Sequence, residues 1–131
     1  MSSESVEGIQ VVLRVILAVA FIAMGALHFQ PAAQRTMAKI IPPRLRFTGV
    51  ANPRNLVIFT GICEIAGGTG LLVPATSLAA GIALAVFLVA VFPANAYAAA
   101  HPERFGRLAI PLGPRLAAQI VMIALILLSV V

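Results

Sequence analysis

Four long apolar segments constrain the fold of this chain more than any other feature. They cover residues 9–29, 56–73, 77–97 and 115–131, and each has about the 17–25 residues that a helix needs to cross a bilayer. Hydrophobic residues make up 61% of the 131 residues and charged residues only 10%, which is more apolar surface than a soluble domain of this size can bury. The sequence therefore predicts an all-α membrane protein with a single integral membrane domain (1–131), built as a four-transmembrane-helix bundle.

The basic residues predict the orientation of this bundle in the cell membrane. The net charge is +5, and the loop between the first two segments has no acidic residue. Eight basic residues lie in or beside this loop and the loop before the last segment: Arg35, Lys39, Arg44, Arg46, Arg54, Arg104, Arg107 and Arg115. Positively charged loops stay cytoplasmic, so we expect both termini outside. We attribute the positive charge to topology and to anionic lipids rather than to nucleic acid, because no basic soluble module is present.

The connection between the first two segments predicts a short helix of its own. Pro31 suits the first position of a helix, and the Pro42-Pro43 pair would end it. The residues between them are partly amphipathic, which favours an interfacial helix on the cytoplasmic surface. The second and third segments are separated by only Pro74-Ala75-Thr76, so we expect these two helices to be antiparallel neighbours.

Glu64 is the one carboxylate inside the apolar segments. A charged group near the middle of a membrane costs roughly 2.5–3.5 kcal/mol on insertion scales. Glu64 must therefore be protonated, paired with another group, or directed into a polar cavity. Gly61 and Gly68 share its helical face, and glycines there let a neighbouring backbone approach closely. We therefore expect Glu64 to point into the bundle.

Four further polar residues are candidate ligand-binding residues together with Glu64. Three of them, His28, Asn95 and Tyr97, lie near the cytoplasmic ends of their segments, and Gln119 lies about one turn inside the last segment. At these depths His28, Asn95, Gln119 and Glu64 are expected to line one cavity that opens toward the cytoplasm. The alternative is that such residues only hydrogen-bond helices to one another.

His28 has the most specific expected contacts. It shares a helical face with Phe21 and Gly25, so we expect it to turn inward. One ring nitrogen would then be held by Asn95 or by the carbonyl that Pro93 leaves without its usual donor. The other ring nitrogen would face the cavity above Glu64, with or without a water between them, and His28 would act as the polar gate of the site.

Several kinds of chemistry are disfavoured by the residues that are present. Cys63 is the only cysteine, so neither an intrachain disulfide nor a thiol pair can form. One Glu and one His are too few for a typical metal site. Catalytic residues cannot be assigned from any motif, so whether the chain is an enzyme stays open.

Five short motifs occur in order along most of the chain. They are GALHF (25–29), IPP (41–43), GICEIAGG (61–68), GLLVP (70–74) and VFPAN (91–95). Together they resemble the DoxX-like family of small four-helix membrane proteins. The resemblance implies a four-helix membrane bundle with His28, Glu64 and Asn95 as characteristic polar positions. The family takes its name from a subunit of a thiosulfate:quinone oxidoreductase, and other members resemble accessory or chaperone-like membrane proteins.

Two classes of function follow from these residues and from the resemblance. In the first, the bundle binds a small apolar ligand, a lipid or a partner helix, and Glu64 orients a polar group. In the second, the chain is a membrane subunit of a quinone-linked oxidoreductase in which Glu64 and His28 handle protons; a quinone is then the one cofactor to expect. A homo-oligomer or a larger membrane complex is compatible with both. Proton-coupled transport is disfavoured because four helices without a paired second acid make a thin pathway unless the protein oligomerises.

Overall fold

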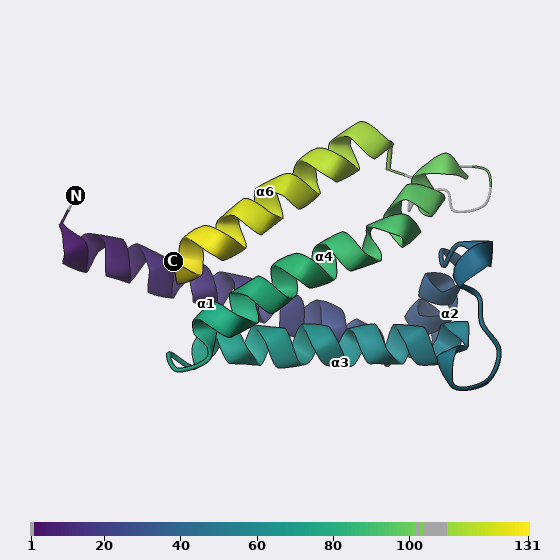
Figure 1. Cartoon of the computed structure of the whole chain (residues 1–131), viewed down its shortest axis with the longest axis horizontal. Helices are drawn as coiled ribbons and strands as arrows, with labels where there is room; N and C mark the ends of the chain where they lie inside the picture. The colour runs from purple at the N-terminus through teal and green to yellow at the C-terminus, as the bar shows by residue number, and fades with distance from the viewer. Residues whose placement is uncertain (1, 102, 104–109) are drawn as a thin grey trace.

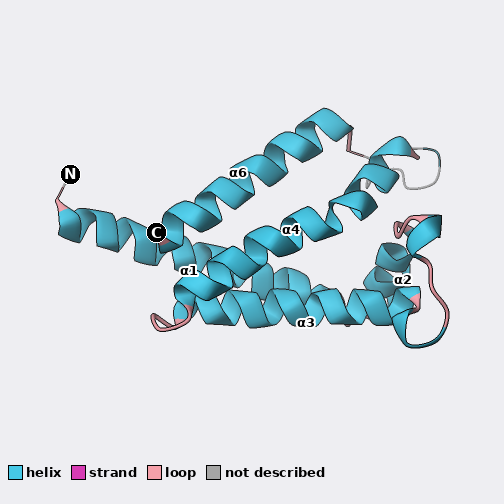
Figure 2. Cartoon of the chain, viewed as in Figure 1, coloured by secondary structure: helices cyan, strands magenta, loops and turns pink. Residues whose placement is uncertain are grey.

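Four long helices and one short helix form the part of the chain that the computed structural model describes, residues 2–101, 103 and 110–131 (Figure 1). The long helices are α1 (Ser3–Leu27), α3 (Pro53–Leu72), α4 (Ser77–Ala100) and α6 (Leu112–Val130), and the short helix is α2 (Pro31–Lys39). Two single-turn 3-10 helices, η1 (Pro43–Leu45) and η2 (Gly49–Ala51), lie between α2 and α3. The described residues contain no strand (Figure 2).

Each of the four apolar segments forms one long helix, as predicted. All four helices are long and apolar enough to cross a membrane. Their ends differ from the expected ones: α1 begins at Ser3 rather than at residue 9, and α4 continues through Pro93 to Ala100 rather than ending at residue 97. The early start of α1 has a local cause, because the Ser2 side chain accepts a hydrogen bond from the Ser5 N–H and caps the helix.

The short helix expected between the first two segments is also present. Pro31 occupies the first turn of α2, and the Gln30 side chain accepts a hydrogen bond of 2.6 Å from the Ala33 N–H. The helix ends at Lys39, before Pro42, because a proline has no N–H to continue the helical hydrogen bonds. Helices α3 and α4 pack against each other across the short turn that joins them, as predicted.

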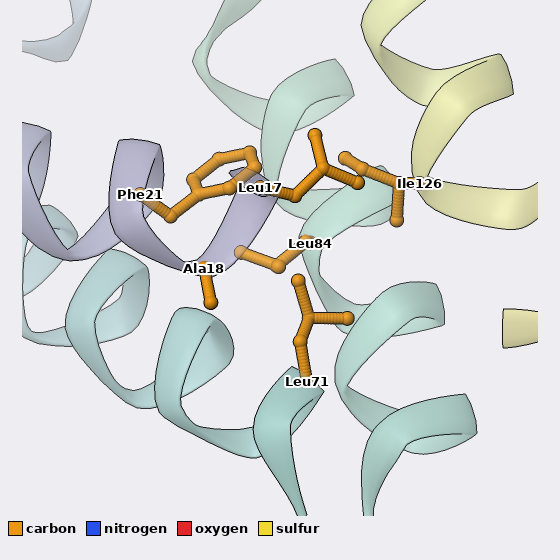
Figure 3. Close-up of a cluster of buried hydrophobic side chains, with 6 residues drawn as sticks. All are labelled: Leu17, Ala18, Phe21, Leu71, Leu84 and Ile126. Atoms are coloured by element: carbon orange, nitrogen blue, oxygen red, sulfur yellow. The ribbon is translucent and has the colours of Figure 1, made fainter. Parts of the chain in front are cut away.

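The four long helices meet in a core that lies toward one end of the bundle. Its buried side chains are Leu17, Ala18 and Phe21 of α1, Leu71 of α3, Leu84 of α4 and Ile126 of α6 (Figure 3). In Figure 1, α4 and α6 rise away from α1 and α3 toward the opposite end, where α2 lies. The core therefore closes one half of the bundle, and the half beside α2 is where a cavity forms.

Glycine residues let α1 and α3 pack closely. A Cβ atom on Gly61 would lie 2.6 Å from the His28 Cβ and 2.9 Å from the Gly25 carbonyl oxygen, and a Cβ on Gly25 would lie 2.7 Å from the Gly61 oxygen. Gly68 faces the backbone of α1 in the same way, 3.0 Å from the Ala18 oxygen. The predicted close approach on the Glu64 face is thus confirmed, and its partner is α1.

Arg14 is held at the end of the bundle that is remote from α2. Its Nη1 donates a 2.6 Å hydrogen bond to the Ser129 carbonyl, and the Gln10 amide donates to the carbonyls of Leu128 and Val131. These contacts provide donors for carbonyl groups that the last turn of a helix leaves without partners. Arg14 therefore binds the C-terminal end of α6.

Candidate functional site

His28 and Glu64 meet where α1 ends against α3. His28 follows the last residue of α1 as its C-cap, and Glu64 lies within α3. The His28 Nε2 and the Glu64 Oε2 are 3.2 Å apart, and each side chain is only 12% exposed. The contact is not aligned as a hydrogen bond, and Oε2 has no hydrogen-bond donor in the part of the chain that the structure describes. It is therefore a short contact between two buried polar groups.

The other ring nitrogen of His28 is fixed by α3. Nδ1 lies 2.8 Å from the Val57 carbonyl oxygen and 3.0 Å from the Thr60 Oγ1. The Thr60 hydroxyl in turn donates to the same Val57 carbonyl at 2.9 Å. A carbonyl oxygen can only accept, so we assign a proton to Nδ1 from this network. The ring is thereby oriented with Nε2 toward Glu64.

These contacts correct part of the expected environment of His28. The inward turn of His28 is confirmed, and Nε2 reaches Glu64 directly. The expected partner of the other nitrogen, Asn95 or the carbonyl freed by Pro93, is wrong: the partner is the Val57 carbonyl. The reason is that His28 ends the helix that packs on α3, so it meets α3 backbone before it can reach α4.

Sequence reasoning missed Thr60 and the Val57 carbonyl. Thr60 lies one helical turn before Glu64 on α3, so it shares the face that carries the carboxylate. This spacing was available in the sequence. The role of the Val57 carbonyl could not be predicted, because every residue has a backbone carbonyl and the sequence does not mark this one.

A cavity of about 490 Å3 lies beside the pair. It is lined by the end of α1, by α2 and the connection to α3, by the first half of α3, and by the second half of α4. Most of its surface is apolar; the residues that supply it include Met24, Ile40, Phe47, Leu56, Phe87 and Val91. Its polar side chains among the described residues are those of His28, Thr60, Glu64 and Asn95. The His28–Glu64 pair thus lies in the wall of a mostly apolar cavity.

Asn95 lines this cavity but also joins two helices. Its Oδ1 accepts a 3.1 Å hydrogen bond from the Arg115 Nη1, and Arg115 Nε donates to the Ile110 carbonyl. The contact fastens the second half of α4 to the start of α6. The structure therefore brings Asn95 to the chamber of His28 and Glu64, with its carbonyl oxygen already occupied.

Tyr97 and Gln119 lie elsewhere. The Tyr97 ring packs on the His101 ring, with centroids 4.3 Å apart, and lines a second, more open hollow. Pro42 and Pro93 line both this hollow and the cavity beside Glu64. Gln119 is half-buried on α6 and is not among the residues that line the cavity, so the expectation that it shares one chamber with Glu64 is wrong.

The described residues define a class: an all-helical protein with four long apolar helices and a buried His–Glu pair at an apolar cavity. Among these residues, no group of three His, Cys, Asp or Glu side chains lies close enough to hold a metal ion. Cys63, next to Glu64 in sequence, is a half-buried free thiol.

The chain belongs to the family described as Domain of unknown function (DUF8561), which matches residues 17–129. The match begins within α1 and ends within α6, so it includes His28, Glu64 and Asn95. No curated protein and no solved structure matches the chain. Nothing in these comparisons links it to the DoxX-like family, so that resemblance stays a prediction.

Proposed function

We propose that this chain is an integral membrane protein that binds a small apolar molecule inside its helical bundle, with the polar end of that molecule held at Glu64. The observation that carries the proposal is the buried His28–Glu64 pair in the wall of an apolar cavity. A volume of about 490 Å3 suits a small molecule, since ligand cavities commonly measure about 300–1,000 Å3 and combine apolar walls with a few polar groups.

The outward faces of the helices support the membrane part of the proposal. Large apolar side chains project from them with more than half of their surface exposed, among them Val12 (58%), Val19 (63%), Phe59 (61%) and Val86 (63%). Soluble monomers rarely expose apolar patches of this extent, and lipid would cover them. The basic residues of α2 would then lie at the cytoplasmic surface of the membrane.

The cost of the buried carboxylate supports a role beyond packing. Gly25, Gly61 and Gly68 already hold α1 and α3 together through close backbone contact, so the two helices do not need a polar pair for their association. A carboxylate near mid-membrane is costly and marks a functional site by default. Glu64 and His28 are therefore better explained as ligand contacts than as an adhesive between helices.

Filling the cavity should remove the bound molecule. Ala94 lines the cavity from α4, so Ala94→Phe should occupy much of it, whereas Ala83→Phe adds the same ring to an exposed position of α4. We expect mass spectrometry after mild detergent extraction to find an apolar molecule with the wild type and with Ala83→Phe, and severalfold less with Ala94→Phe. Equal retention by both variants would contradict binding in this cavity.

The same pair supports a second candidate function, a membrane subunit of a quinone-linked oxidoreductase. His28 and Glu64 lie 3.2 Å apart, close enough to exchange a proton, and a positioned pair of this kind can transfer protons to a bound quinone. Identification of the retained molecule decides between the two candidates. A quinone that is lost in Ala94→Phe would favour the oxidoreductase subunit, and any other apolar molecule would favour the binding protein.

We also expect the N-terminus outside and α2 in the cytoplasm. In a Cys63→Ala background, a membrane-impermeant maleimide should label Ser3→Cys in intact cells and should label Thr36→Cys, on the exposed face of α2, only after permeabilisation. The reverse pattern would overturn this topology. The basic loop with Arg104 and Arg107, also expected in the cytoplasm, lies outside the described residues.

A further inference from the structure

We take His28 and Glu64 to share one proton, although Nε2 and Oε2 are not aligned as a hydrogen bond. The Nδ1 proton is already committed to the Val57 carbonyl, so only Nε2 and the carboxylate can vary. If neither Nε2 nor Oε2 carried a proton, two lone pairs would face each other at 3.2 Å. If both atoms carried a proton, two hydrogen-bond donors would face each other at the same distance. One proton remains in either allowed state, imidazolium with carboxylate or neutral imidazole with carboxylic acid. The pair is electrically neutral in both.

The second carboxyl oxygen of Glu64 is a hydrogen-bond acceptor in both states. If the proton is on Nε2, Glu64 is a carboxylate and both of its oxygens accept. If the proton is on Oε2, then Oε1 is the carbonyl oxygen of the acid and again only accepts. No described residue donates a hydrogen bond to Oε1, and Glu64 lines the cavity. Oε1 therefore offers a hydrogen-bond acceptor to a molecule bound in the cavity.

The charges of the residues that line the cavity indicate whether the bound molecule has an anionic, a cationic or an uncharged polar end. Its described lining contains neither lysine nor arginine, so an anionic head group would meet acceptor lone pairs with no cation to balance it. An ammonium group would lose its hydration on entering the cavity and would meet only a neutral pair in apolar surroundings. This desolvation costs free energy. We infer that the molecule bound at Glu64 is an uncharged amphiphile whose polar end is a hydroxyl group, an alcohol or a phenol. This inference rests on the ligand-binding function proposed above.

Two probes that differ only in the donor test this inference. 4-Hexylphenol carries an O–H group, and in 4-hexylanisole a methyl group replaces that hydrogen. We would measure the binding of each to the full chain in lipid nanodiscs by ligand-detected NMR titration, with protein-free nanodiscs as the reference for partition into lipid. The phenol should bind about tenfold more tightly or better, the factor that one hydrogen bond to a charged or strongly polar group supplies.

A matched pair of variants locates the preference at Glu64. The amide of Glu64→Gln can both accept and donate, so the preference for the phenol should fall severalfold, whereas Glu7→Gln, at an exposed position of α1, should retain it. If 4-hexylanisole binds the wild type as tightly as the phenol, the inference is overturned and the cavity remains a binding site. If neither probe binds the wild type, the inference and the proposed function both fail. The wild-type comparison decides even if Glu64→Gln does not fold.

Discussion

Replacing Gly61 with leucine should separate α1 from α3 and lower the free energy of unfolding by about 3 kcal/mol, in the upper part of the range for overpacking. Even the Cβ atom of the new side chain would lie 2.6 Å from the His28 Cβ and 2.9 Å from the Gly25 oxygen. Neither neighbour is the flexible end of a side chain, so the helices themselves must move. Because His28 is one of the displaced groups, its contact with Glu64 should be lost as well.

Gly8 offers the matched control for this prediction. A Cβ atom at Gly8 would have no neighbour within 4 Å, so Gly8→Leu should leave stability unchanged or raise it slightly through the better helix propensity of leucine. Thermal unfolding of both variants in detergent measures the difference. A Gly61→Leu protein as stable as Gly8→Leu would contradict the close α1–α3 contact.

Glu64→Leu should destabilise the bundle by about 1–3 kcal/mol, the cost of leaving a buried polar group without its partner. It removes the only group that faces His28 Nε2 in the described part of the chain and places a branched side chain on the face that packs against Gly25. Glu64→Gln keeps both the length and an acceptor oxygen, so it should keep the fold. Glu64→Leu should lose the bound molecule, and Glu64→Gln should retain severalfold less of it than the wild type.

The comparison of the two variants separates a functional carboxylate from a structural one. Thermal unfolding reports the fold, and mass spectrometry of the extracted protein reports the bound molecule. If Glu64→Gln unfolds as readily as Glu64→Leu, the carboxylate is a structural member of an ion pair, and the function proposed for it is wrong. Glu7→Gln should match the wild type in both measurements, since its carboxylate is exposed.

The helices could be predicted from the sequence because their positions depend on the length and hydropathy of continuous segments of the chain. An apolar run of some twenty residues determines where a helix lies, and prolines and the Pro74–Thr76 turn determine where it can end. The close contact at Gly61 was also foreseeable, since a glycine next to a carboxylate on one face indicates a neighbouring backbone. What the pattern did not indicate is that this neighbour is α1.

The partners of the polar residues were harder to predict because they depend on rotation of each helix about its axis. Depth alone placed His28 beside Asn95, yet His28 bonds to the Val57 carbonyl and Asn95 bonds to Arg115. In the sequence, Arg115 is recognisable only as one of the basic residues that predict the topology. Two side chains at one depth can lie on opposite sides of a bundle, and no periodicity within a single helix distinguishes these cases.

The two hollows share a wall made of Pro42 and Pro93. A proline nitrogen carries no hydrogen, so these two residues present only carbon surface and carbonyl oxygens to anything that touches them. The boundary between the two hollows therefore adds apolar surface to both of them and no N–H donor.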